Sequence, residues 1–219
     1  MGNFFNMDNG FFTVLSKICD IIFLSVIWAI LCIPIITIGP ANTAMYYATV
    51  KVIRKERGYL FREFFKSFRL NFKRGAIIGL VLTLITAIMI FNLIVTWGAI
   101  DGSNKSSMFF GVYVAISFVV LCFSIYVFPI LSRFDMTIKQ LIKAASFMSM
   151  KHLLSTLGMA IVTVATVIAI LFLPILIFIL PATSVLINSL LMERVLKKYL
   201  PKPVVQEGEA PIKDEWYLS

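Results

Sequence analysis

The sequence predicts an all-α, polytopic helical membrane bundle, and two observations lead to that prediction. The chain has 219 residues, of which 60% are hydrophobic and only 14% are charged, whereas a soluble domain is about half apolar and a quarter charged. The charges are also segregated. No Asp, Glu, Lys, Arg or His occurs in 21–50, 75–100, 106–132 or 153–192. Runs of about eighteen apolar residues are long enough to cross a hydrocarbon core of roughly 30 Å.

The placement of positive charge predicts the orientation. Of the 20 Lys and Arg residues, nine lie in 51–74, four in 133–151 and four in 194–202. Each cluster adjoins an apolar run, as the positive-inside rule describes for cytoplasmic segments. The loop 98–107 carries one Asp and one Lys and is expected outside. Both termini are therefore expected in the cytoplasm, and the basic clusters are expected to contact anionic lipid headgroups.

The length of the last apolar run fixes part of the helix count. As one helix, the 40 uncharged residues 153–192 would measure about 60 Å, twice the hydrocarbon core. This run must therefore cross twice. The segment from Pro174 to Pro181 is the expected break, because proline ends or kinks a helix and restrains the residue before it.

The first apolar run follows the same plan, with Pro34, a short apolar linker, Pro40 and then a helix that ends in basic residues. The sequence thus predicts two helical hairpins with outward turns. The second helix is short and only moderately apolar, so it is expected to pack inside the bundle. The expected membrane helices are 12–35, 40–57, 75–97, 108–131, 153–173 and 177–195. The alternative has five spans, with 40–58 lying along the inner surface and the N-terminus outside.

The first turn is the most distinctive local pattern. Gly39 tolerates positive φ and close approach, and Pro40 suits the start of a helix. Polar side chains around them are expected to bond backbone groups freed at the turn. The residues assigned to this motif are Pro34, Thr37, Gly39, Pro40, Ala41, Asn42 and Thr43.

Two basic amphipathic helices are expected at the membrane interface, one in 61–74 and one in 139–152. In the first, Phe recurs at helical spacing between basic residues. Such a helix between two spans is more simply interfacial than nucleic-acid binding, and docking of a soluble partner stays open beside it. The charged ends near 51–74 and 133–152 are expected to form one cytoplasmic docking face. Its assigned residues are Arg62, Phe64, Phe65, Lys66, Phe68, Arg69, Lys73 and Arg74.

Ionisable side chains are rare inside the predicted membrane helices, which argues against an enzyme. His152 is the only histidine, and neither a zinc site nor a catalytic triad forms from one histidine without partners. Lys17 and Asp20 are expected to pair at the interface, and Asn92 and Asn188 to bond across the bundle. No catalytic, cofactor-binding or metal-binding residue is expected.

Composition changes at the C-terminal end. Residues 1–200 are expected to form one membrane-embedded domain. Residues 201–219 lose the apolar character and mix prolines with both signs of charge, which is typical of a mobile tail.

The stretch "IPIITIGPANT" at 33–43, followed by "YYATVKVIRKERG" and "FREFFKSFRLNFKRG", resembles the YesL family of small bacterial membrane proteins. The Pro-x-x-Thr-x-Gly-Pro-Ala core is met by Pro34, Thr37, Gly39, Pro40 and Ala41. The likeness covers about the first 75 residues. It implies a multi-pass protein of the bacterial inner membrane, with a domain of unknown function, encoded near carbohydrate ABC importers.

Two function classes follow. The first is a non-enzymatic accessory or regulatory partner of a carbohydrate importer, in contact with an ABC permease or another membrane protein. The second is a small stand-alone transporter or channel, formed by one chain or by a homo-oligomer. The lack of a nucleotide-binding motif means that any ATP coupling must come from another chain.

Overall fold

A computed structural model describes residues 10–98 and 104–199, with side chains from Val14 and from Met108 onward in these two ranges. The expected tail 201–219 and half of the expected outside loop 98–107 lie beyond the described residues. The described part is helical, and no strand occurs in it. Its α-helices are α1 (Gly10–Leu31), α2 (Ile38–Ala48), α3 (Leu60–Leu70), α4 (Phe72–Gly98), α5 (Asn104–Arg133), α6 (Ile138–Lys151), α7 (Leu153–Phe172) and α8 (Leu180–Leu196).

Four of these helices are long and apolar enough to cross a membrane: α1, α4, α5 and α7. The expected multi-pass helical class is thereby confirmed. The two remaining helices of the expected six are shorter. α2 has 11 residues, about 16 Å at 1.5 Å per residue, and α8 has 17 residues, about 26 Å. Length and composition therefore support four spans and leave the count of six a prediction.

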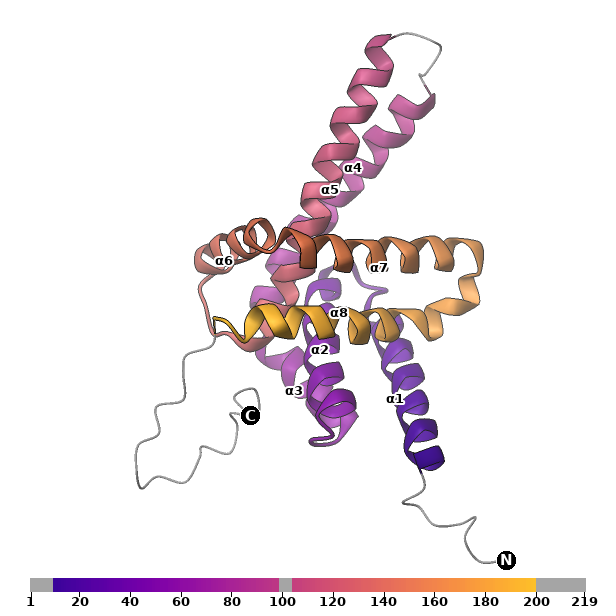
Figure 1. Ribbon diagram of the computed structural model, residues 1–219, viewed down its shortest axis with the longest axis vertical. Coiled ribbons are helices and arrows are strands. Elements are labelled where there is room, and N and C mark those ends of the chain that lie inside the picture. The colour runs from indigo at the N-terminus through magenta and orange to yellow at the C-terminus, as the bar shows by residue number, and fades with distance from the viewer. Residues whose placement is uncertain (1–9, 99–103, 200–219) are drawn as a thin grey trace, which may run out of the picture.

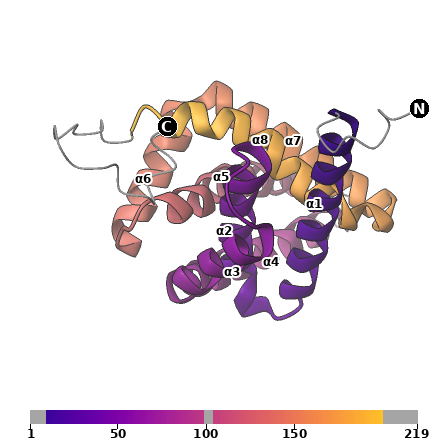
Figure 2. The same cartoon turned by 90° about the horizontal axis from the view of Figure 1, so that it is seen from below.

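The helices are arranged as two antiparallel hairpins that cross (Figure 1). α4 and α5 run side by side and project well beyond the rest of the chain. α7 and α8 form the second hairpin and run across the base of the first, while α1 and α2 extend from the crossing in the opposite direction. Figure 2, which views the molecule along the α4–α5 direction, shows the same crossing. The crossing brings the ends of several helices together at the base of the bundle.

Both proline-bounded linkers form hairpin turns of the expected kind. After α1 the chain makes a 3₁₀ helix over Ile35–Thr37, and after α7 another over Pro174–Phe178. Pro40 and Pro181 lie in the first turns of α2 and α8, where a missing N–H does no harm. The second turn also packs against α1. The Ser25 hydroxyl in α1 donates to the carbonyl of Ile179 and accepts from the N–H of Ala182.

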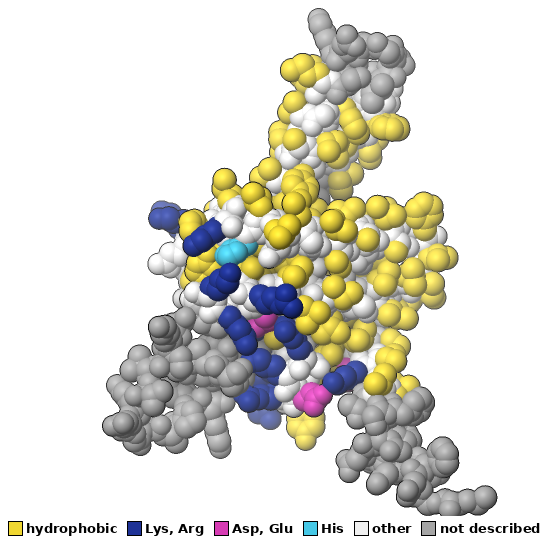
Figure 3. Space-filling model, viewed as in Figure 1, with side chains coloured by type: hydrophobic (Ala, Val, Ile, Leu, Met, Phe, Trp, Pro, Cys, Tyr) yellow, Lys and Arg dark blue, Asp and Glu magenta, His cyan; other side chains and the backbone are white. Residues whose placement is uncertain are grey.

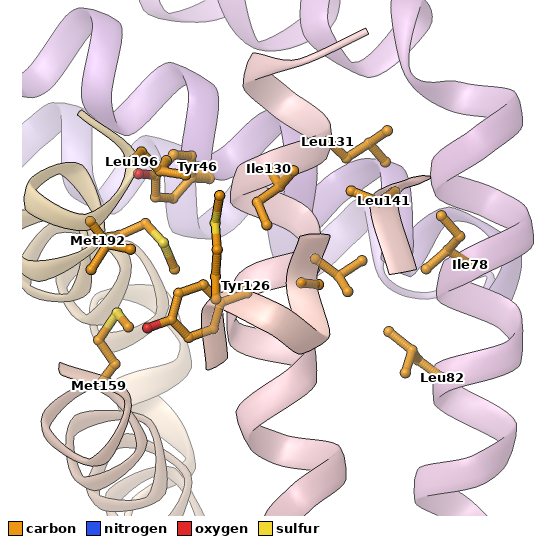
Figure 4. Close-up of a cluster of buried hydrophobic side chains, with 14 of the residues drawn as sticks. Tyr46, Ile78, Leu82, Tyr126, Ile130, Leu131, Leu141, Met159, Met192 and Leu196 are labelled. Atoms are coloured by element: carbon orange, nitrogen blue, oxygen red, sulfur yellow. The ribbon is translucent and has the colours of Figure 1, made fainter. Parts of the chain in front are cut away.

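α2 is the most enclosed helix, as its low apolarity led us to expect. It packs against α1, α3, α4, α5 and α8. The main core is formed by α2, α4, α5 and α8 together with α6 and α7. Figure 4 shows Tyr46 from α2 beside Met192 and Leu196 from α8, with Tyr126 from α5 near Met159. A short π-helix, Thr49–Arg54, extends α2 toward the basic cluster.

Large apolar side chains cover the projecting hairpin and α7 (Figure 3). Phe91 and Trp97 on α4, Val119 on α5 and Phe172 on α7 are all exposed. A soluble monomer rarely exposes apolar area of this extent, so these faces are suited to lipid or to other membrane helices.

Candidate functional site

The motif at the first turn is built around Thr37. Its hydroxyl contacts the carbonyl oxygens of Leu31 and Pro34. The Leu31 carbonyl is at the end of α1, where carbonyls have no partner within the helix. Thr43 donates to the carbonyl of Gly39 one helical turn back. Both hydroxyls therefore bond backbone carbonyls near the turn. Asn42 instead accepts a hydrogen bond of 2.8 Å from the indole Nε1 of Trp28 on α1.

Gly39 and Pro40 do more than shape the turn, because both are buried where α2 crosses α4. A Cβ on Gly39 would lie 2.0 Å from the carbonyl oxygen of Gly75 and 2.8 Å from the Cα of Gly79. The contact is backbone against backbone, so no side chain can move aside. Glycine is required here for close approach, whereas a positive φ is found at Gly58 among the described glycines. The Gly75–Gly79 spacing is the small-residue pattern typical of tight helix crossings in membranes, and our sequence analysis did not use it.

The expected docking face lies partly inside the protein. Phe64 is fully buried and packs in a core cluster with Leu24, Met45 and Ile53. Phe65 and Phe68 are half-buried. The aromatic side chains most open to a partner on this segment are Tyr59 and Phe61, which are 79% and 58% exposed. In this fold, Phe64 holds α3 in place and does not contact a partner.

The basic residues of the face are exposed. They are Arg62, Lys66, Arg69, Lys73 and Arg74. Arg74 pairs with Asp135, which joins the start of α4 to the connection between α5 and α6. Lys139, Lys143 and Lys151 on α6 are also exposed, as are Lys197 and Lys198 after α8. Figure 3 shows Lys and Arg gathered on one part of the surface, around His152. We call these ten exposed residues the basic face.

Two ion pairs lie beneath the basic face. The first joins Lys51 of the π-helix to Glu63 of α3 at 2.8 Å. Lys51 also donates to the hydroxyl of Tyr47 at 3.1 Å. Both charged groups are largely withdrawn from solvent, so each depends on the other for its charge compensation. The pair fixes α3 against the end of α2.

The second ion pair is deeper. Arg133, the last residue of α5, pairs with Glu193 of α8, and the side chains are only 1% and 5% exposed. The same carboxylate oxygen accepts a 2.7 Å hydrogen bond from the hydroxyl of Tyr46 in α2. Nearby, Arg54 donates to the carbonyl of Ser189 at 2.9 Å. α2, α5 and α8 are therefore tied together by charge at the base of the bundle.

A neutral cavity of about 300 Å³ lies next to this pair. Tyr46 and Met192 belong to its wall, together with residues of α1, α5, α7 and α8. Asn188 lines it and donates to Thr163 across the α7–α8 hairpin at 3.1 Å, so the expected interhelical bond is confirmed. The Oδ1 of Asn188 is buried and has no hydrogen-bond partner within the described part of the chain.

Two other expected polar contacts are not found. Asn92 bonds the carbonyl of Ile88 in its own helix, so the expectation of a bond across the bundle is wrong for this residue. Lys17 pairs with Glu56 at 2.6 Å rather than with Asp20. α1 and α2 fold against each other and bring Glu56, in the loop after the π-helix, close to Lys17. The spacing of residues along α1 alone cannot predict this pair. The pairing lowers the pKa of Glu56 through its hydrogen bond to Lys17.

His152 lies between α6 and α7, with Nε2 3.1 Å from the hydroxyl of Tyr199. Burial first, and then the charges of Lys198 and Lys151, lower the pKa of its imidazole. The described residues contain no group of three His, Cys, Asp or Glu side chains that could hold a metal ion.

The Arg133–Glu193 pair was not predicted from the sequence. Both residues stand at the ends of apolar runs, where a charge is the ordinary signal of a membrane boundary. The only available signal was Glu193 itself, an acidic residue immediately before a basic cluster. Its partner lies 60 residues away along the chain, and only the fold identifies it.

Comparison with known protein families gives one result. Residues 21–93 match a family described as "Protein of unknown function, DUF624". The match runs from the middle of α1 almost to the end of α4, and thus contains the proline turn, the glycine crossing and α3. Neither the curated proteins nor the solved structures gave a match. Over about a third of its length, this chain is similar to a family whose function is unknown.

Proposed function

We propose that the protein is a non-enzymatic, multi-pass membrane protein that acts as an accessory or regulatory partner of a carbohydrate importer. The observation that supports this proposal is the basic face. Its exposed cations come from α3, the start of α4, α6 and the end of α8, and Figure 3 shows Lys and Arg side chains gathered on the part of the surface around His152. The carbohydrate importer is proposed as the partner because of the resemblance at 33–43. The matched family is one of unknown function, so it indicates no activity.

In this proposal the basic face is cytoplasmic and lies at the inner surface of the bacterial cell membrane. The chain is multi-pass, both termini are inside, and α3 and α6 lie at the interface. The two ion pairs beneath the face support a docking role because they hold α3 and the ends of α5 and α8 in fixed positions. Anionic lipid contributes about 1 kcal/mol per basic residue near the surface, and a protein partner adds contacts to the exposed aromatics.

A photo-cross-linking experiment tests the proposal. A photoreactive amino acid replaces Phe61, which is exposed beside the basic residues, or Phe172, which is exposed at the far end of α7. Each variant is expressed in native membranes with the importer permease encoded beside it. We expect a discrete adduct with the permease from position 61 and none from position 172. Replacing Arg62, Lys66 and Arg69 with Gln should reduce that adduct.

The same experiment separates lipid from protein. If position 61 gives only lipid adducts while the permease is present at normal levels, the accessory role is wrong and the face serves lipid alone.

The neutral cavity favours a second candidate, a small transporter or channel. An uncharged lining suits a neutral solute better than an ion. Uptake of a radiolabelled neutral solute into vesicles that contain only this protein would favour this candidate over the accessory role.

A further inference from the structure

We propose that the neutral cavity binds a neutral alcohol that carries an apolar chain, such as a monoacylglycerol. The inference goes beyond the proposed function, since it concerns a small ligand and is tested on the isolated protein. It rests on the hydrogen-bonding state of the lining residues, on their lack of charge, and on a second cavity beside the first.

The lining presents hydrogen-bond acceptors. Ser124, Thr166 and Ser184 line the cavity, and each gives its hydroxyl proton to a carbonyl of its own helix at 2.8 Å. A hydroxyl that has donated in this way offers its lone pairs to a neighbour. Asn188 adds its buried Oδ1, which accepts no hydrogen bond from the described residues. The complementary ligand must therefore donate hydrogen bonds.

The ligand must also be neutral. No Asp, Glu, Lys or Arg lines the cavity, so a charged ligand would lose its hydration without compensation. Asn42 supplies a donor, because its Oδ1 is occupied by Trp28 and its amide nitrogen remains to donate. A hydroxyl group both donates and accepts, so it fits a wall that has the Asn188 acceptor and the Asn42 donor.

A second cavity beside the first has room for the apolar part of the ligand. A second cavity of about 550 Å³ shares Asn42, Leu121, Ser124 and Phe128 with the first. It is lined mainly by apolar side chains of α4 and α5. In Figure 1 these two helices form the hairpin that projects from the bundle, and its surface is exposed and apolar. An acyl chain held there, with its alcohol group beside Asn188, would use both cavities.

Trp28 makes the test direct, because it lines the cavity. The chain has three tryptophans, so Trp97→Phe with Trp216→Phe leaves Trp28 as the only tryptophan, and its emission is excited at a wavelength that tyrosine does not absorb. The variant is placed in phosphatidylcholine nanodiscs and titrated with 1-monooleoylglycerol, with methyl oleate or with glycerol. We expect a saturable change in Trp28 emission with 1-monooleoylglycerol, and none with methyl oleate or glycerol over the same concentrations.

Substitutions then locate the site. Asn188→Leu in this background should weaken binding of 1-monooleoylglycerol about tenfold, because a buried acceptor for the ligand hydroxyl is lost. The matched control is Asn92→Leu, since Asn92 lines neither cavity and should leave the affinity unchanged. Ser184→Leu fills the cavity without removing the Asn188–Thr163 bond and should abolish the response, which keeps the test valid if Asn188→Leu fails to fold.

Three results would overturn the inference. An equal response to methyl oleate would mean that the acyl chain alone is sensed. An equal response to glycerol would mean that the site takes a water-soluble alcohol. Unchanged affinity in folded Asn188→Leu or Ser184→Leu protein would mean that the cavity is not the site. None of these results bears on capture of a permease at position 61, so the two proposals fail separately.

Discussion

Replacing Glu193 with Gln should destabilise the protein strongly, because it leaves the guanidinium of Arg133 buried without its counter-charge. Arg133 and Glu193 are 1% and 5% exposed, so solvent cannot compensate for the loss. Breaking a buried pair by removing one partner costs about 3–5 kcal/mol. The hydrogen bond from Tyr46 can persist to the amide oxygen of Gln, so we expect the lower end of that range.

Thermal unfolding in mild detergent, followed by circular dichroism, measures the effect. For a chain of this size, a change of 3 kcal/mol corresponds to roughly 6–12 °C in Tm. The matched control is Asp135→Asn, which removes the acid of the Arg74 pair. That pair is 44% and 87% exposed, and an exposed pair contributes about 0–1 kcal/mol. Its Tm should therefore change by no more than about 4 °C.

A double substitution tests the cause. Arg133→Met with Glu193→Leu removes both charges together, and apolar replacement of a buried pair is often neutral or stabilising. The double variant should recover most of the Tm lost in Glu193→Gln. If Glu193→Gln behaves like Asp135→Asn, or if the double variant is as unstable as the single one, the unpaired charge is not the cause.

Three further predictions follow from the turn, the glycine crossing and His152. Gly39→Ala should destabilise the folded protein by about 3 kcal/mol, because the added methyl group meets the backbone of Gly75 and overpacking costs roughly 1–3 kcal/mol. The control is Gly111→Ala, where a Cβ has no neighbour within 4 Å; its Tm should be unchanged or raised. The lowered pKa of His152 means that folding favours its neutral imidazole. Its contribution to the stability of the fold is therefore present above pH 6.5 and is lost as the pH falls through the pKa of the folded state. The Tm should drop less between pH 7.5 and 5 in His152→Gln than in wild type. A cysteine at Ile33, 78% exposed in the first turn, should react in a Cys-free background with an impermeant thiol reagent added outside, and labelling only from the cytoplasmic side would contradict the expected six-span topology.

The sequence by itself determined the class and the linear plan of this protein. Four uncharged apolar runs predicted membrane helices, and α1, α4, α5 and α7 lie within or across them. Proline placement predicted both short hairpins, and the turns over Ile35–Thr37 and Pro174–Phe178 occur as expected. These features are local. Apolar length and a missing N–H act on the helix that carries them, whatever packs against it.

Only the tertiary structure decided which side chains meet. Phe61 and Phe64 belong to one aromatic repeat, yet the first is exposed and the second is fully buried. The sequence cannot separate them, because in a membrane protein both lipid and core accept an apolar side chain. For the same reason, periodicity does not indicate the rotation of α3 about its axis.

The partners of the charged groups were decided in the same way. Glu193 meets Arg133 and Tyr46 because α8 crosses the ends of α5 and α2, and Lys17 meets Glu56 because α1 and α2 form a hairpin. Charge along the chain fixes which end of a helix stays near water. Which acid meets which base depends on how the helices cross, and at the α2–α4 crossing that depends on the close approach of Gly39 to Gly75 and Gly79.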